Sequence, residues 1–200
     1  MELLGIPHLF YQLVSARIVV DGREFGTWLS RSGSYRHSTE RKQALDVFYR
    51  FNAKEGERPL DLCDRMGWGR QIRQMILADY LIANRDRHGA NIEVLRGADG
   101  LQRLAPLFDN GLSFVFSCCG DEDRVGAFDV MQDVPANNYI GTRSLEENLT
   151  FLQGWDLNIN SLESSWEDVL FYGLEDVLPL AHRQAMWNMI RKRWQRYEAL

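Results

Sequence analysis

The sequence contains only three lysines and three cysteines, and it has no long apolar segment. Cys63, Cys118 and Cys119 have neither the even number of a disulfide framework nor the spacing of a zinc site, which indicates reduced thiols. No stretch approaches the roughly 18 apolar residues of a membrane helix, and the N-terminus lacks the regions of a signal peptide. We therefore expect a cytoplasmic protein without a membrane partner.

The charge balance argues against a nucleic-acid-binding protein. The formal net charge is −5, whereas a nucleic-acid footprint requires a strong basic bias. One basic stretch, Arg191–Arg196, is interpreted as the exposed face of a helix whose Trp187, Ile190 and Trp194 pack inward. The length of 200 residues and the hydrophobic content of 45% are ordinary for a globular protein with one core.

The patterning predicts a small amount of strand followed by a mainly helical chain. Residues 11–20 and 23–30 flank Asp21-Gly22, a strong hairpin signal. Apolar residues at helical spacing predict a helix from Ser38 to about Phe51 and another over 71–83. Glycines, acids and Asn137-Asn138 predict a long loop over Ser117–Arg143. Further helices are expected over 144–152, 161–171, 174–180 and 182–198.

Two polar motifs lie close together in the middle of the chain. The first is Asn84-Arg85-Asp86-Arg87-His88-Gly89-Ala90-Asn91, and the second is Phe108-Asp109-Asn110-Gly111. An expected hairpin over 92–96 and 101–108 would return the second motif to the same end of a small sheet. An Asp with an Asn five positions on, followed by a second Asp, has the spacing of a kinase catalytic loop and its metal motif. Phosphoryl transfer needs one carboxylate near the attacking hydroxyl, and an Asn and a second Asp to hold magnesium.

Each motif alone is also compatible with an ordinary polar turn, because Asn and Gly both tolerate positive φ. Three features favour a catalytic role. The segment before Asp86 is apolar at helical spacing, which would place this residue directly after a buried helix. Four ionisable residues, 85–88, follow one another, a poor composition for a simple turn. Asp109 ends the apolar run 104–108, which would hold it rigidly. Asp79, seven residues before Asp86 on the expected helix, is expected to bind loop amides or Arg85 rather than to take part in chemistry.

The segments 79–91 and 104–111 resemble the catalytic segment of HipA-like kinases. These are bacterial Ser/Thr protein kinases, several of which are toxins of toxin–antitoxin pairs. The resemblance covers about Met1–Phe116, and the remainder only by position. It implies an α+β, mainly α fold: a protein-kinase-like C-lobe with an N-terminal β-hairpin and a catalytic-loop hairpin.

The same resemblance implies the site and its cofactors. Asp86 would be the catalytic Asp, Asn91 and Asp109 would be the metal ligands, and the cofactors would be Mg²⁺ and ATP. The Asp-Arg-His-x-x-Asn core followed by Asp-x-Gly is also similar to phosphatidylinositol kinases.

A lysine for the nucleotide phosphates is missing. Lys42, Lys54 and Lys192 do not lie in an apolar strand, and no Gly-rich phosphate loop precedes Asp86. Residues 3–7, Leu-Leu-Gly-Ile-Pro, resemble a segment that HipA-like kinases have inside the N-lobe, after the nucleotide-binding lysine. We therefore expect residues 1–36 to be a remnant of the N-lobe and hinge hairpin, and residues 37–200 to be the helical C-lobe.

These patterns leave two main functions open. The first is a catalytic lobe that transfers phosphate to a protein Ser/Thr hydroxyl and is inactive without an ATP-binding N-lobe. Its partners would be a protein substrate, and the missing N-lobe or an antitoxin. The second is a pseudokinase or protein-interaction module with a vestigial magnesium site. A lipid kinase is less favoured, because no basic loop would face a membrane.

Overall fold

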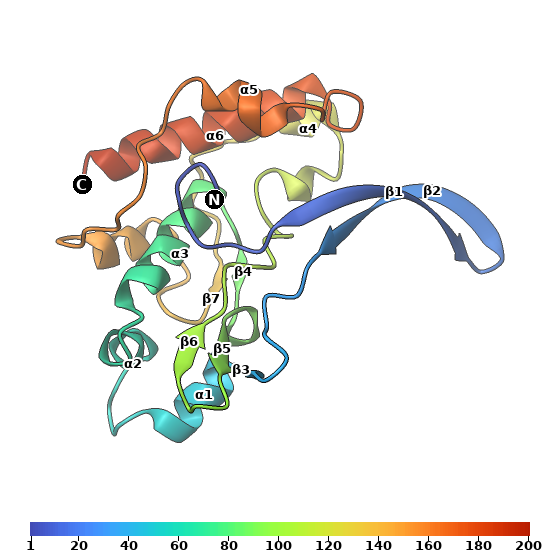
Figure 1. Cartoon of the computed structure of the whole chain (residues 1–200). Coiled ribbons are helices and arrows are strands. Elements are labelled where there is room, and N and C mark those ends of the chain that lie inside the picture. The colour runs from blue at the N-terminus through green and yellow to red at the C-terminus, as the bar shows by residue number, and fades with distance from the viewer.

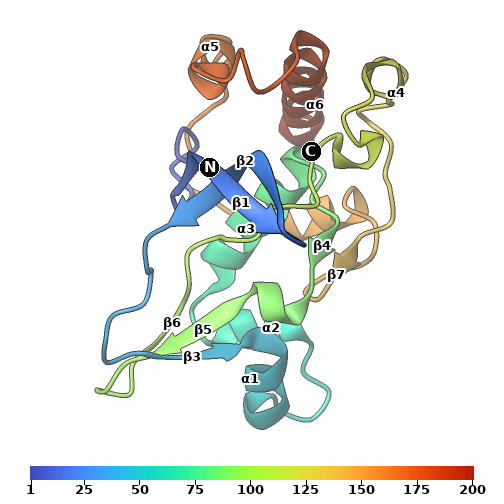
Figure 2. The same ribbon diagram turned by 90° about the vertical axis from the view of Figure 1, so that its right-hand side faces the viewer.

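The computed structural model describes all 200 residues and has an α+β architecture (Figure 1). A two-stranded arm near the N-terminus reaches away from a body that combines helices with a small sheet. The long helix near the C-terminus lies along one end of this body, and the small sheet lies near the other end (Figure 2). No helix is long and apolar enough to cross a membrane.

The arm is a regular antiparallel hairpin of strands β1 (Tyr11–Val20) and β2 (Arg23–Ser32). The register runs from Tyr11 opposite Ser32 to Val20 opposite Arg23, and the turn residue Gly22 has a φ of +75°. The sequence predicted this hairpin almost to the residue, because the Asp-Gly turn needs positive φ at both positions. No third strand pairs with either edge.

The small sheet has three antiparallel strands in the order β3–β5–β6. Their bounds are β3 Arg41–Ala44, β5 Glu93–Arg96 and β6 Gln102–Leu104. The predicted hairpin that turns at residues 98–100 is therefore confirmed. The helix predicted from Ser38 is wrong in its first half: residues 41–44 pair with β5, and α1 covers only Leu45–Asn52. Backbone pairing with a strand distant in the sequence has overridden the local helical pattern.

The core surrounds a central helix, α3 (Gly69–Leu81), which is buried on nearly all sides. A short helix, α2 (Pro59–Arg65), packs against it and has its proline in the first turn, where no donor is lost. Leu77 and Tyr80 of α3 are almost inaccessible to solvent. Since α3 leads directly into the segment around Asp86, the core fixes where that segment begins.

The second half of the chain is less regular than the sequence predicted. The region 117–143 is not a bare loop: it contains part of a 3₁₀ turn, the short helix α4 (Glu122–Gly126) and one strand of a two-residue parallel pair with the segment at Asp86. The helix predicted over 174–180 is absent, and those predicted over 144–152 and 161–171 are shorter. The remaining elements are β4 Asp86–Arg87, η1 Gly89–Asn91, η2 Phe116–Cys118, α4 Glu122–Gly126, β7 Asn137–Asn138, η3 Glu147–Leu152, α5 Trp166–Phe171 and α6 Leu180–Glu198.

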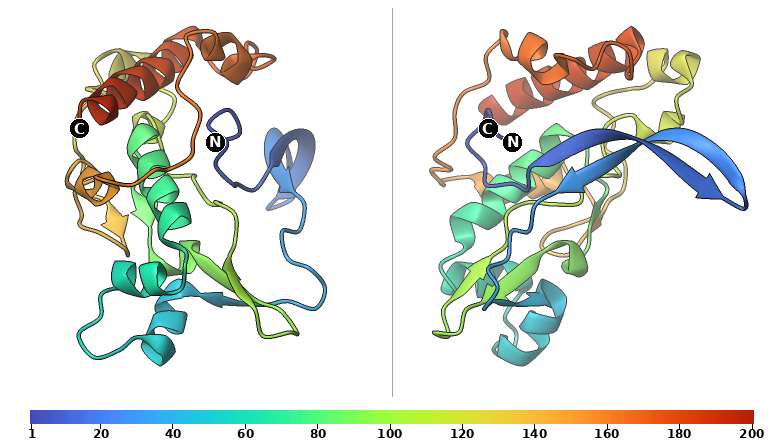
Figure 3. Two further views of the ribbon diagram at one scale, coloured as in Figure 1. Left: turned by 60° about the vertical axis from the view of Figure 1, so that its left-hand side comes forward. Right: turned by 45° about the vertical axis from the view of Figure 1, so that its right-hand side comes forward.

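Helix α6 crosses the molecule next to α3 and α4 (Figure 3). Trp187 and Trp194 are buried as predicted. Arg193, which the sequence placed on an exposed basic face, is 2% exposed and donates hydrogen bonds to the backbone carbonyls of Tyr80, Val130 and Gln132. It therefore connects α6 to the end of α3 and to the segment that leads to β7.

Candidate active site

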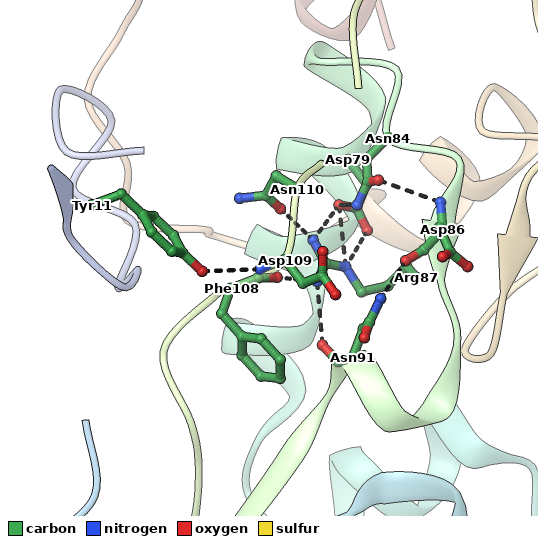
Figure 4. Close-up of polar contacts among 9 residues, drawn as sticks. All are labelled: Tyr11, Asp79, Asn84, Asp86, Arg87, Asn91, Phe108, Asp109 and Asn110. Carbon is green, nitrogen blue, oxygen red and sulfur yellow. Dashed lines mark hydrogen bonds and ion pairs between the residues drawn. The ribbon is translucent and has the colours of Figure 1, made fainter. Parts of the chain in front are cut away.

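The segment that carries Asp86 begins with a sharp change of direction after α3. Ala83 has a φ of +51°, and the Asn84 amide N–H donates to the Asp79 carbonyl. The Asn84 side chain donates to the Asp79 carboxylate at 2.8 Å and accepts from the Asp86 backbone N–H at 3.3 Å. Both ends of the turn are thereby fixed to the helix, and Asp86 follows in a defined orientation (Figure 4).

A buried ion pair lies at the centre of the site. Arg87 is 1% exposed and Asp79 is fully buried, and the guanidinium donates to both carboxylate oxygens, at 2.8 and 3.0 Å. Burial alone would lower the pKa of Arg87, but the charge and hydrogen bonds of Asp79, with Asp109 and Asp86 farther away, raise it above its ordinary value. Asp79 thus has the structural role that the sequence predicted, although it binds Arg87 and Asn84 rather than Arg85.

Arg87 also connects the two sequence motifs. Its Nη1 donates to the carbonyls of Asn91 at 3.2 Å and Phe108 at 2.7 Å, and its Nη2 donates to the Asn110 side chain at 2.6 Å. Phe108 and Asn110 are the two neighbours of Asp109 in the chain. One guanidinium therefore holds both neighbours of Asp109, one by its backbone and one by its side chain, against the loop that contains Asp86 and Asn91 (Figure 4).

Asp86 is partly exposed and has no tight charged partner. One of its carboxylate oxygens accepts a hydrogen bond from the Asn137 side chain at 3.2 Å. The other lies 3.9 Å from His88 Nε2, too far for a hydrogen bond. Asp86 pairs with Asn137 in the β4–β7 ladder, which holds this amide beside the carboxylate. The arrangement leaves an oriented, solvent-accessible carboxylate that can accept a proton or a hydrogen bond from a hydroxyl.

Asn91 and Asp109 both have oxygen atoms that no protein group uses. The Asn91 side-chain N–H donates to the Asp86 carbonyl at 2.9 Å, which leaves its amide oxygen without a hydrogen bond. Asp109 is exposed, its φ is +53°, and its carboxylate makes no hydrogen bond or ion pair. Hard oxygen ligands of this kind suit Mg²⁺, which is usually held by one or two carboxylates and completed by phosphates and water. No three His, Cys, Asp or Glu side chains gather anywhere, so a magnesium ion here would depend on these two oxygens and on its substrate.

The root of the arm lies directly beside Asp109. The Leu9 N–H donates to the Leu107 carbonyl at 2.7 Å, and the Leu107 N–H donates to the Pro7 carbonyl at 2.9 Å. The Asp109 N–H donates to the Tyr11 hydroxyl at 3.3 Å, as Figure 4 shows. The root of the arm is therefore fixed next to Asp109.

No lysine that could bind the phosphates of a nucleotide lies at the site. Lys42 is on β3 and forms an ion pair with Glu93 at 3.0 Å, Lys54 follows α1, and Lys192 is in α6. Pockets of about 600, 480 and 340 Å³ occur elsewhere, and Asp86 and Asp109 line none of them. Both carboxylates are nevertheless accessible to solvent.

The structure thus brings the three predicted site residues into one cluster. Asp86 and Asn91 are linked directly, and Asp109 joins them through Arg87. The sequence reasoning missed Asn137 and the central position of Arg87. Asn137 is 51 residues from Asp86, and no spacing rule connects them. Arg87 could have been found, because an Arg within an apolar-flanked loop needs an acidic partner and Asp79 is the acid nearest to it in the preceding helix.

Comparison with known proteins supports the fold. No family model and no curated protein matches this sequence. Among solved structures, the crystal structure of a Helicobacter pylori proinflammatory kinase, CtkA, is similar, with a TM-score of 0.61 and 14% sequence identity. The similarity covers 97% of this chain and 78% of that chain. The chain therefore has a kinase-like fold.

Proposed function

We propose that this chain is a kinase catalytic lobe that transfers phosphate from ATP, with magnesium, to a Ser or Thr hydroxyl of a protein. We further propose that it belongs with HipA-like kinases and that it needs an additional lobe or partner for full activity. The HipA-like assignment rests on the segments 79–91 and 104–111, and a toxin role with an antitoxin partner depends on it. The kinase-like fold is consistent with these proposals at a coarser level.

One observation carries the proposal: Asn91 donates its amide N–H to the Asp86 carbonyl and keeps its amide oxygen free, next to the loop of Asp109. Asn91 is 8% exposed as a whole residue, and its amide oxygen is not among the buried side-chain atoms that lack a partner, so the oxygen is accessible to a ligand. A metal-binding Asn needs its oxygen free and its orientation fixed, which is the arrangement found here.

The proposed roles follow from the positions of the side chains. Asp86 would accept the hydrogen bond of the acceptor hydroxyl and orient its oxygen toward the phosphate. Asn137 holds one oxygen of the Asp86 carboxylate, so the other faces the acceptor. Magnesium bound by Asn91 and Asp109 would neutralise charge on the nucleotide phosphates. Arg87 would keep these residues in register without touching the substrate.

The need for a further lobe is supported by the surface of the arm. One face carries Val14, Ile18, Phe25 and Leu29, and the last two are 49% and 46% exposed. A two-stranded hairpin is marginally stable alone in water, and an apolar face of this kind is normally covered. A partner that covered the root of the arm would lie next to Asp109, because Tyr11 contacts Asp109 there.

The chain without a partner should bind magnesium–ATP only weakly. The lysine and the Gly-rich loop that bind nucleotide phosphates in kinases are absent, so we expect a dissociation constant of about 1 mM or higher. Shifts of amide NMR signals should be confined to the loops of Asn91 and Asp109. An NMR titration of the labelled chain with ATP and magnesium measures both. Micromolar affinity for magnesium–ATP would contradict an incomplete phosphate-binding site. Shifts only at distant residues would contradict the proposed position of the site.

Removing a proposed metal ligand should change how the binding of ATP depends on magnesium. In the same titration, Asp109→Asn is expected to abolish the magnesium-dependent part of the shifts, because the charged ligand is lost. Asn91→Ala should weaken it less, because only a neutral ligand is lost. Asp168→Asn, at an exposed residue of α5 without side-chain hydrogen bonds, is the matched control and should behave like the unaltered chain. An unchanged magnesium dependence in Asp109→Asn would remove this residue from the site.

A pseudokinase is the second candidate, and the open site without a lysine favours it for the chain alone. The two functions differ in whether a bound partner restores phosphoryl transfer. Incorporation of labelled phosphate from ATP into protein, with and without the partner, separates them.

A further inference from the structure

Two arginines face each other on the small sheet without any acidic partner. Arg41 on β3 and Arg96 on β5 are directly opposite in the register, and both are exposed. Neither forms an ion pair or a side-chain hydrogen bond, although the chain has five more acidic than basic residues. Like charges directly opposite each other destabilise an antiparallel pair, so an anion bound between them would offset this repulsion.

The opposite face of the same sheet is arranged differently. There, Lys42 pairs with Glu93 at 3.0 Å and Arg103 pairs with Glu40 at 2.8 Å. These pairs satisfy every cation that the three strands place on that face. The unpaired arginines are therefore a property of one face and not of the whole sheet.

A pocket of about 600 Å³ lies at this face, between the sheet and the end of α1. Gln102 lies opposite Arg96 on β6, so that Arg41, Arg96 and Gln102 form one row across the three strands. Gln43 from β3 and Asn52 from α1 add further amides to the lining, and Lys42, which is paired with Glu93, also contributes to it. Phe51 of α1 also lines the pocket and is 79% exposed, which offers an apolar surface beside the cations. Figures 1 and 2 show β3, β5 and α1 together at the end of the body far from α6.

We propose that this pocket binds a phosphorylated side chain of a polypeptide. Two guanidinium groups side by side offer more donors than one carboxylate can accept, whereas a phosphate monoester has three acceptor oxygens and close to two negative charges. The pocket is much larger than a phosphate, and its amides and Phe51 suit the backbone and side chains on either side of a phosphorylated residue. The net charge of −5 makes a nucleic acid a poor alternative.

This site is separate from the proposed catalytic cluster. None of Asp86, Asn91 and Asp109 lines the pocket that contains Arg41 and Arg96. Binding here needs neither ATP nor magnesium, so the proposal stands or fails independently of the proposed kinase activity.

The test is an NMR titration of the full chain with three probes, without nucleotide. The probes are a short Ala/Leu peptide with a central phosphoserine, the same peptide without phosphate, and inorganic phosphate. We expect the phosphopeptide to bind at least about tenfold more tightly than either of the others, with shifts at Arg41, Arg96 and Gln102. Equal binding of the two peptides would overturn phosphate recognition. Equal binding of phosphopeptide and inorganic phosphate would overturn the polypeptide part, and shifts elsewhere would overturn the site.

Charge reversal at Arg96 is expected to weaken phosphopeptide binding and to stabilise the fold. Arg96→Glu should abolish phosphopeptide binding but raise the melting temperature slightly, because a glutamate opposite Arg41 replaces repulsion with attraction. Arg143→Glu changes the net charge equally at an exposed residue outside the pocket and should leave the binding nearly unchanged. Arg96→Lys keeps the charge but loses the planar fork, and binding should be intermediate. Retained binding in Arg96→Glu, or equal losses in Arg96→Glu and Arg143→Glu, would overturn the proposal.

Discussion

Replacing Asp86 with Asn is expected to reduce phosphoryl transfer about 10²–10⁴-fold, the usual contribution of a general base. The substitution keeps the shape of the side chain and the neighbouring contacts with Asn84 and Asn91, which use the backbone of residue 86. The substitution removes the negative charge of the carboxylate that, under the proposed function, would meet the acceptor hydroxyl, and its remaining oxygen can still accept from Asn137. Nucleotide affinity should therefore change little, so the effect belongs to the transition state.

The measurement is transfer of labelled phosphate from ATP to protein by the chain together with the partner that completes it. Asp168→Asn is again the matched control, since it removes an exposed carboxylate far from the loop in sequence and without hydrogen bonds. Full activity of Asp86→Asn would return the motif to the status of a polar turn. A parallel loss of nucleotide affinity would instead assign Asp86 to nucleotide or metal binding.

Local signals predicted the parts of the fold that depend on neighbours in the sequence. The Asp21-Gly22 hairpin, the turn at residues 98–100 and the buried helix before Asp86 all belong to this group. The sequence could not predict β3, because residues 41–44 form a strand only where β5 offers its edge. The same holds for Arg193, whose three carbonyl partners come from segments about 60 to 110 residues away.

The candidate site also contains residues that local sequence signals predicted and residues that they did not. The grouping of Asp86, Asn91 and Asp109 was expected from spacing, since Asp86 and Asn91 lie in one short segment and a short hairpin returns the chain to it. Asn137 is held beside Asp86 by the parallel pairing of β4 and β7, which no local sequence pattern predicts. The root of the arm at Tyr11 is fixed beside Asp109 by contacts of Pro7 and Leu9 with Leu107, which only the folded chain brings together.

The second large effect concerns stability rather than chemistry. Arg87→Met is expected to lower the free energy of unfolding by about 3–5 kcal/mol, because it leaves the Asp79 carboxylate buried without its partner. It also removes the donors that the carbonyls of Asn91 and Phe108 use. Urea denaturation followed by circular dichroism measures the change, and the midpoint should fall clearly.

Two further variants show whether the loss comes from the buried pair. Asp79→Asn should be milder, because the amide oxygen can still accept from Arg87, and the double variant should lose less than the sum of the two single losses. The control is Arg58→Met, which breaks an ion pair of similar length, 2.8 Å, with Asp61 at the surface and should leave the midpoint unchanged. If Arg87→Met behaves like Arg58→Met, the pair does not hold the two motifs together. If instead Arg87→Met unfolds more readily and the losses of the two single variants are not additive, the register of Asp86, Asn91 and Asp109 depends on one buried guanidinium.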